Sequence, residues 1–178
     1  MGTKLLKLTS LLLLAATLTG CPGEEECFAP AAITQVDDLI LISPFQQIYN
    51  QGDVITFSVT IPATNNYFND GTEINLLEAT NAFEARLICT DQIFIGNNVE
   101  FVKGSPGSVN GWFNLIYNNE NQLYELEIKV TLNKIGTYTI YTADSIAFQG
   151  EKICNRYTIE TNIIDNEPGR SDFIFTVQ

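Results

Sequence analysis

The stretch Tyr124-Glu125-Leu126-Glu127-Ile128-Lys129-Val130-Thr131-Leu132 decides the fold class of this chain. Five apolar residues alternate in it with four polar ones. This is the period of a β-strand that turns one face to a core and the other to water. We therefore expect Glu125 and Glu127 on the solvated face, where both carboxylates stay ionised.

The same alternation recurs along the chain from residue 39 onward. It marks further strands at 55–61, 157–163 and 173–177, and a hairpin of 112–117 with 123–132 across an Asn-rich turn. Turn signals rich in Asn, Gly and Pro separate these segments. About eight to nine short strands and no strong helix predict an all-β, antiparallel sandwich or barrel.

Residues 72–90 carry the weakest pattern. Ile74, Leu77 and several Glu and Ala residues allow a helical turn or two. We expect two short strands there.

Composition limits the function classes. The chain has 178 residues, 9 Lys plus Arg against 21 Asp plus Glu, no His and 45% hydrophobic residues, which suits one folded domain. The net charge of −12 repels phosphate backbones, so we expect no nucleic-acid partner. The lack of His removes Ser-His-Asp and Cys-His nucleophile systems and the usual zinc sites.

The first 20 residues have the features of a secretory signal. Lys4 and Lys7 precede an apolar stretch at 8–18, which is too short to span a bilayer. Leu18-Thr19-Gly20-Cys21 then resembles the lipobox of bacterial lipoproteins. The resemblance implies cleavage before Cys21 and acylation of Cys21, hence a partner membrane and an outer-membrane lipid anchor. The alternative is an ordinary cleaved signal with a chance Gly-Cys pair.

An acidic run follows that cysteine. Pro22-Gly23-Glu24-Glu25-Glu26 is similar to the export signal by which lipoproteins of Bacteroidota reach the cell surface. The alternative is a solvated linker, which leaves the domain on the periplasmic face; both place it outside the cytoplasm. We expect a signal peptide at 1–20, an acylated tether at 21–36 and the β-sandwich at 37–178.

The segment 43–57 resembles the opening of extracellular immunoglobulin-like modules, in which a Gly-Asp turn leads into the second strand. The resemblance implies an antiparallel immunoglobulin-like sandwich.

Three cysteines remain besides Cys21, so one intramolecular bridge at most is possible. Cys89 and Cys154 both lie in strand-like segments, and we prefer this pair; a bridge from Cys27, or none, stays open. Without His or a C-x-x-C pair we expect no metal site built on these cysteines.

Other candidate sites are less specific. Trp112 and Tyr117 are candidates for an aromatic platform that stacks on sugar rings, although a lone Trp on a sandwich strand also suits the core. Asn and Asp oxygens at 65–66, 69–73 and 165–167 are candidates for calcium ligands or for their own turns, and we expect no other cofactor. Asp144-Ser145-Ile146 resembles the site at which Bacteroidota O-glycosylate exported proteins, which implies a sugar on Ser145.

The sequence thus favours a lipid-anchored binding or scaffolding module with a protein or glycan partner. Loops 62–72 and 96–111 are the expected contact regions. One alternative is a periplasm-facing structural accessory of an outer-membrane assembly. A remote alternative is a carboxylate-based hydrolase, which needs two acids in one cleft.

Overall fold

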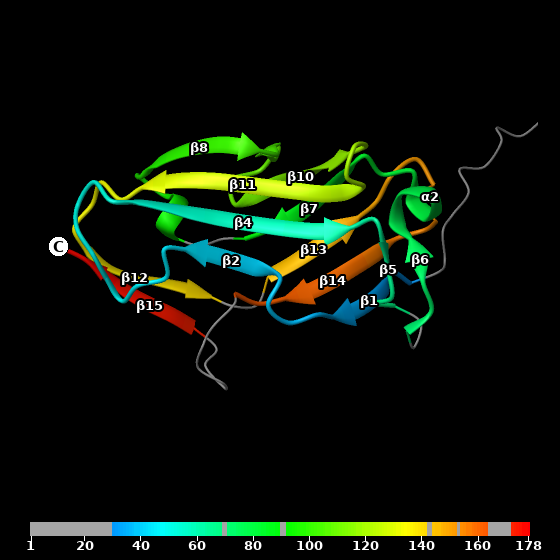
Figure 1. Cartoon of the computed structure of the whole chain (residues 1–178), viewed down its shortest axis with the longest axis horizontal. Coiled ribbons are helices and arrows are strands. Elements are labelled where there is room, and N and C mark those ends of the chain that lie inside the picture. The colour runs from blue at the N-terminus through cyan, green and yellow to red at the C-terminus, as the bar shows by residue number, and fades with distance from the viewer. Residues whose placement is uncertain (1–29, 69–70, 90–91, 142–143, 153, 164–171) are drawn as a thin grey trace, which may run out of the picture.

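The computed structural model describes residues 30–68, 71–89, 92–141, 144–152, 154–163 and 172–178 (Figure 1). Within them the chain forms fifteen strands and two short helical segments. The strands are β1 (Ala32–Gln35), β2 (Ile40–Ser43), β3 (Ile48–Tyr49), β4 (Val54–Pro62), β5 (Thr64–Asn65), β6 (Ile74–Asn75), β7 (Glu84–Ile88), β8 (Asn98–Lys103), β9 (Ser105–Pro106), β10 (Trp112–Asn118), β11 (Leu123–Thr131), β12 (Gly136–Tyr141), β13 (Asp144–Phe148), β14 (Tyr157–Thr161) and β15 (Asp172–Val177). The helical segments are α2 (Leu76–Thr80) and the 3-10 helix η2 (Gln92–Phe94). The all-β prediction is confirmed.

The larger sheet is organised around the strand that the sequence marks most clearly. β11 pairs with β4 antiparallel over its whole length, from Leu123 opposite Pro62 to Thr131 opposite Val54. The order across this sheet is β1-β14-β13-β7-β10-β11-β4-β2, with β8 on β11 and β9 on β10. Alternate residues of β4 are buried, as the period-two pattern predicts.

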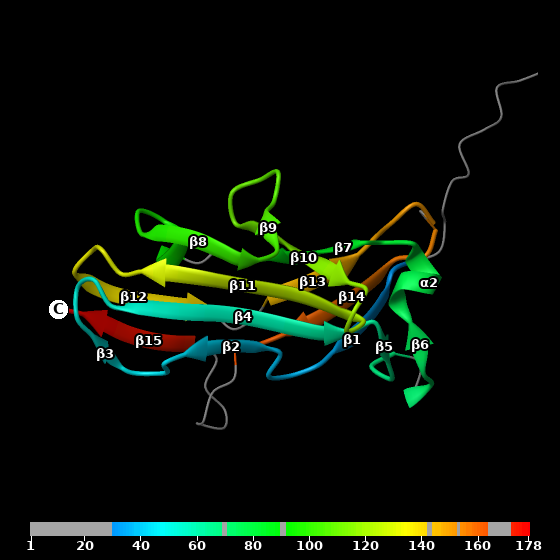
Figure 2. The ribbon, with the colours of Figure 1, turned by 45° about the horizontal axis from the view of Figure 1, so that its top comes forward.

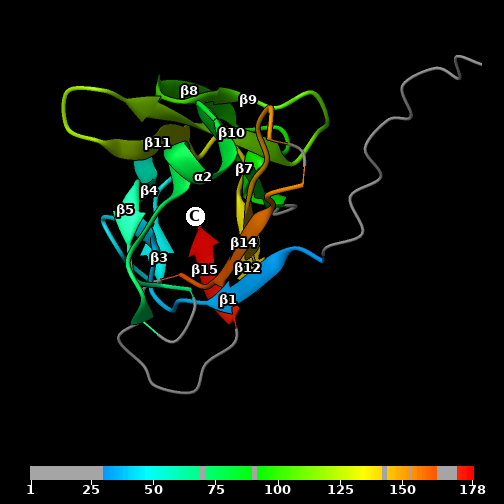
Figure 3. The same ribbon diagram turned by 90° about the vertical axis from the view of Figure 1, so that its right-hand side faces the viewer.

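A smaller sheet, β12-β15-β3, completes the enclosure of the core. Seen along the length of the molecule, the larger sheet curls and the smaller sheet lies below the strands β8, β10 and β11 (Figure 3). A parallel bridge between Ile40 and Ile163 links β2 to the residues after β14. The core between these strands is aliphatic and aromatic, and Tyr49, Tyr124 and Phe57 are among its largest fully buried side chains.

The finer expectation of an antiparallel immunoglobulin-like sandwich is not established. Two pairs, β1·β14 and β15·β3, are parallel, so the sheets are mixed. The strand count exceeds the eight or nine expected: four of the fifteen strands are only two residues long, and eleven longer ones remain.

The segment 72–90 differs from the prediction. Residues 76–80 form the helix α2, so the expectation of two strands is wrong there and holds only for the flanks, β6 and β7. The Asn75 side chain accepts a hydrogen bond from the Glu78 N–H at the start of α2, and Asn81 in the left-handed conformation ends it. These two caps stabilise a helix of little more than one turn.

The tether prediction also needs correction. The sheet begins at Ala32 with β1, which lies inside the expected linker 21–36. No helix among the described residues is long and apolar enough to cross a membrane.

Candidate functional site

A change of neighbour along β11 opens an apolar hollow in the domain. β10 pairs with β11 only between Ile116 opposite Glu125 and Asn118 opposite Leu123. β8 then occupies the same edge of β11, with a bulge between Glu127 and Ile128. Beyond this exchange a hollow of about 620 Å³ opens among η2, β8, β9, β10 and the loop 107–111. We call this hollow the wedge; β8 and β9, which border it, lie on the upper side of Figure 2.

The wedge has an aromatic floor. The ring of Phe113 lies 4.7 Å from that of Phe94 and 5.8 Å from that of Phe101, centroid to centroid. Phe94 in turn makes an edge contact with Phe57 of the core. The residues that line the wedge are Phe94, Ile95, Val99, Phe101, Pro106, Gly107, Val109, Asn110, Gly111, Trp112 and Phe113. Its volume and its apolar lining are typical of sites for small ligands.

Two basic side chains lie against Trp112 of the lining and against Gly96, next to Ile95 of the lining, but neither lines the wedge itself. The guanidinium carbon of Arg86 lies 4.7 Å from the ring centroid of Trp112, a cation–π contact. The Lys134 ammonium lies so close to Gly96 that a side-chain carbon at Gly96 would collide with it. The described residues contain one ion pair, Lys103–Glu125, so neither Arg86 nor Lys134 pairs with a described carboxylate.

Two glycines permit the backbone path that forms the wedge. Gly104, between β8 and β9, has φ +82° and no space for a β-carbon, which would lie 2.5 Å from the Asn114 carbonyl oxygen. At Gly107 a β-carbon would lie 2.7 Å from the Trp112 carbonyl oxygen. Both positions therefore require the absence of a side chain.

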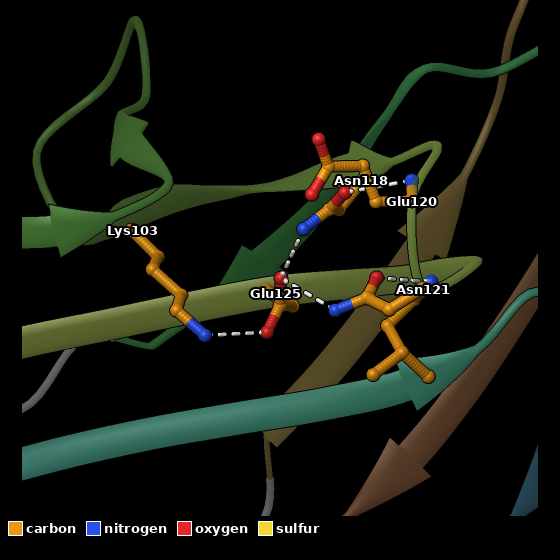
Figure 4. Close-up of polar contacts among 6 residues, drawn as sticks. Lys103, Asn118, Glu120, Asn121 and Glu125 are labelled. Atoms are coloured by element: carbon orange, nitrogen blue, oxygen red, sulfur yellow. Dashed lines mark hydrogen bonds and ion pairs between the residues drawn. The ribbon is translucent and has the colours of Figure 1, made fainter.

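A second, polar site lies beside the β10–β11 turn (Figure 4). Glu125 is buried, and its carboxylate accepts hydrogen bonds from Lys103 Nζ at 2.5 Å, Asn118 Nδ2 at 3.1 Å and Asn121 Nδ2 at 3.3 Å. The hydrogen bond from Lys103 holds the pKa of Glu125 below its usual value, against the opposing effect of burial, and those from Asn118 and Asn121 act in the same direction as Lys103. The expectation that Glu125 lies on a solvated face is wrong, because Lys103 and the turn cover that face of β11.

Glu125 is not set up as a general acid. Among the residues whose burial is described it is the one buried carboxylate, and its lowered pKa keeps it ionised. Glu120 and Glu125 both line a hollow beside the β10–β11 turn. Because Lys103 and Asn118 hold Glu125 ionised, this pair does not supply the protonated acid that the remote hydrolase alternative needs.

The two candidate platform residues do not lie together. Trp112 and Tyr117 are five positions apart on β10, which places their side chains on opposite faces of the strand. Trp112 is half-buried at the wedge, whereas Tyr117 packs on Tyr124 and Phe83. A joint Trp112–Tyr117 platform is therefore wrong: Trp112 lines the wedge, whereas Tyr117 lines a separate hollow beside the β10–β11 turn.

Ser145 lies on β13 between two strands. It is opposite Ile88 of β7 and Glu160 of β14, and it is half-buried. Glycosylation of Ser145 stays a prediction.

The calcium candidates are only partly described. Asn65 uses its side chain locally: its amide donates to the Pro62 carbonyl, and its oxygen accepts from the Tyr67 N–H. Positions 69–70 and 165–167 lie outside the described residues. Within the described part of the chain no group of three or more acidic or cysteine side chains is placed to hold a metal.

The preferred cysteine pairing is wrong. Cys154 is disulfide-bonded, and Cys89 is a buried thiol. Cys89 follows the last residue of β7, whereas Cys154 follows β13 at the other end, where Phe148 is opposite Ala85. The four residues from Ala85 to Cys89 span about 13 Å in a strand. A disulfide requires Cα atoms within about 7 Å. Cys21 and Cys27 lie outside the described residues.

Sequence reasoning did point to part of the wedge, since most of its lining belongs to the predicted contact loop 96–111. It missed Arg86, Lys134 and the Lys103–Glu125 pair. The alternation of polar and apolar residues in a strand does not indicate which other segment of the chain will pack over a charged side chain. The aromatic run Phe94, Phe101, Trp112 and Phe113 was a signal that could have indicated an apolar cluster here.

No protein-family model and no curated protein matches this chain. Among solved structures, a family 123 glycoside hydrolase from Clostridium perfringens, described in work on glycolipid glycan hydrolysis, matches at 11% identity and a TM-score of 0.25. The match covers 75% of this chain and 24% of that chain, so this chain spans about a quarter of its length. At this identity and TM-score the likeness supports neither a shared fold nor a shared activity.

Proposed function

We propose that this chain is an extracytoplasmic binding module held at an outer membrane by a lipid on Cys21, and that the wedge is its ligand site. The wedge is the observation that carries the proposal. It is a partly open apolar hollow of about 620 Å³ with few polar groups, bounded by the loop segment from which the sequence led us to expect contacts. A hollow of this kind is suited to binding a small molecule or a partner's apolar side chain.

The position of β1 bears on whether an anchored module would leave the wedge accessible. β1 begins at Ala32, eleven positions after Cys21, and forms the edge of the larger sheet four strands away from β10. A lipid on Cys21 would therefore join the domain at a different edge from the wedge. The wedge would stay accessible while the module is anchored.

Protease treatment of intact cells tests the location. If the module is displayed on the surface, its peptides are released from cells without lysis, and Cys21→Ala abolishes the membrane association. Complete protection until lysis would contradict surface display and favour the periplasm-facing structural accessory.

Energy transfer from Trp112, the single tryptophan of the chain, tests the wedge. We expect N-phenyl-1-naphthylamine, a neutral apolar fluorophore, to bind the full chain carrying Cys21→Ala and to accept energy from Trp112. Val109→Glu puts a charge at the wedge on a residue that is 49% exposed, and it should weaken binding at least about tenfold.

Val102→Glu is the matched control. Val102 is 45% exposed on β8 but does not line the wedge, so this variant should bind as the parent does. Equal binding by both variants would show that the fluorophore occupies another place.

A further inference from the structure

The loop between β9 and β10 contains the single Asn-Gly pair of the chain, Asn110-Gly111. This loop projects from the upper side of the domain in Figure 2. The Trp112 N–H donates to the Val109 carbonyl at 3.0 Å, which closes residues 109–112 into a tight turn. Gly111 has φ +82°, a conformation that glycine adopts readily. The pair therefore forms the tip of a turn, and the Asn110 side chain is exposed there.

The Asn110 side chain is not held by hydrogen bonds. Within the described part of the chain, neither its amide nor the Gly111 N–H has a hydrogen-bond partner. Asn65 and Asn118, by contrast, each donate from the side-chain amide to another group of the domain. The Asn110 amide can therefore rotate toward the next peptide nitrogen without breaking a hydrogen bond.

We propose that Asn110 deamidates spontaneously and that the product alters the wedge, whose lining includes Asn110 and Gly111. The Gly111 backbone nitrogen forms a bond to Cγ of Asn110, the Cγ–Nδ2 bond breaks, and the proton of the backbone nitrogen leaves with the amide as ammonia. Water then opens the succinimide ring at either carbonyl, which gives aspartate or isoaspartate. Glycine favours the first step because it has no β-carbon to hinder the approach of its nitrogen to Cγ.

Either product places a carboxylate at position 110, on the lining of an apolar hollow. Isoaspartate also lengthens the main chain by one carbon within the turn that precedes Trp112. An ionised group beside an apolar ligand lowers the affinity, because ligand binding removes water from the charge. The wedge would thus lose affinity as the molecule ages. This consequence rests on the proposed function, whereas the deamidation itself does not.

Peptide mass spectrometry tests the modification. The full chain carrying Cys21→Ala is held at pH 8 and 37 °C, then denatured and digested with trypsin. One tryptic peptide, 104–129, contains both Asn110 and Asn119, because it has no Lys or Arg before its last residue. Asn119 is the internal control, since it is exposed in the β10–β11 turn but a glutamate follows it. We expect Asn110 to convert at least about tenfold faster than Asn119.

Binding of N-phenyl-1-naphthylamine, measured by energy transfer from Trp112, tests the effect on the wedge. Asn110→Asp reproduces the aspartate product and should weaken binding about three- to tenfold relative to the fresh parent chain. The parent chain should lose affinity during the incubation in step with the converted fraction. Asn110→Gln should keep its own starting affinity through the same incubation, because its longer side chain closes a ring far more slowly.

The outcomes separate the two parts of the proposal. Conversion of Asn110 no faster than that of Asn119 would overturn the deamidation site. Unchanged affinity in Asn110→Asp would overturn the effect on the wedge. Failure of the fresh parent chain to bind the fluorophore would overturn the proposed function and that effect together, while the peptide masses would still decide the deamidation.

Discussion

The ammonium of Lys103 lies 2.5 Å from Oε1 of Glu125, and the two residues differ greatly in exposure. The Lys103 side chain is 47% exposed and that of Glu125 is 10% exposed. Water therefore screens the lysine while the carboxylate depends on protein donors. The stabilising role of this pair is to satisfy the buried acid, which also accepts from Asn118 and Asn121 in the adjacent turn.

Replacing Glu125→Gln should lower the free energy of unfolding by about 1–3 kcal/mol at pH 7, because the charge that accepts three hydrogen bonds is lost. Glu120→Gln removes an exposed carboxylate from the same turn and should change stability by less than about 0.5 kcal/mol. Urea unfolding of both variants measures the difference. Similar values for the two would contradict a structural role for Glu125.

The same carboxylate predicts a pH dependence. Its pKa is lower in the folded chain than the ordinary value of 4.5 that an unfolded chain would have, so folding favours the ionised form. Its contribution is fully present above about pH 5 and is lost as the pH falls through the folded pKa. The stability gap between the parent chain and Glu125→Gln should narrow in that acid range. A gap that stays constant between pH 7 and pH 3 would argue against this origin.

Gly104→Ala should destabilise the chain more than Gly52→Ala does. Both glycines have positive φ, +82° and +93°, so each alanine adopts an unfavourable backbone conformation, at about 1 kcal/mol. Only at Gly104 would the new carbon also collide, with the Asn114 carbonyl oxygen and with Leu126 Cδ1 at 2.6 Å, whereas Gly52 has open space around it. Thermal unfolding of the two variants isolates the cost of the collision. Equal midpoints would mean that β8 and β9 can separate without cost.

Tyr124→Phe should cost about 1–1.5 kcal/mol of stability. The buried Tyr124 hydroxyl donates to the Ala82 carbonyl at 2.7 Å, and the variant leaves that acceptor without its donor. Burial, with a smaller effect of Tyr117, raises the pKa of Tyr124 well above its ordinary value of 10.0, so the folded chain keeps the proton. Stability should therefore fall as the pH rises above about 10, where the unfolded chain loses that proton. Absorbance at 295 nm should show Tyr124 ionising only as the chain unfolds, and early ionisation would contradict its burial.

The disulfide of Cys154 should connect to Cys27. The Ala32 N–H donates to the Arg156 carbonyl at 2.9 Å, which places the start of β1 beside the loop that holds Cys154. Cys27 precedes Ala32 by five residues, a reach of about 16 Å in extended chain. Cys21 would already carry the lipid. Mass spectrometry of non-reduced peptides should find the 27–154 pair, and a 21–154 pair would contradict both this bridge and the lipid anchor.

The sequence predicted the strands well where one face meets the core and the other meets water. β4, β11 and the C-terminal β15 follow that pattern, since their apolar residues are buried in alternation. The burial of Glu125 was not predicted. An alternating pattern distinguishes the two faces of a strand, but it does not show that another segment of the chain covers the outer face. Helix α2 was not predicted because its five residues are too few to show a helical period. The N-cap residue Asn75 and Glu78 three positions later were nevertheless a recognisable helix-start signal.

The site was predictable only in part, for a related reason. Trp112 directly follows the loop 96–111 in the sequence, so their proximity in space could be expected from sequence alone. Arg86 and Lys134 come from β7 and from the turn before β12, and their positions depend on strand order across the sheet. Strand order is a long-range property that local alternation does not encode.

The parallel pairing of β1 with β14 would have a mechanical consequence if the proposed lipid on Cys21 anchors the domain. Four register pairs, Ala32 with Tyr157 through Gln35 with Glu160, join β1 to the sheet. With the expected Cys27–Cys154 bridge intact, a pull on the N-terminus would pass through the disulfide into the segment before β14 and would not load these hydrogen bonds. Once the bridge is reduced, the same pull, directed along β1, would load the hydrogen bonds of the four pairs together in shear instead of opening them one after another.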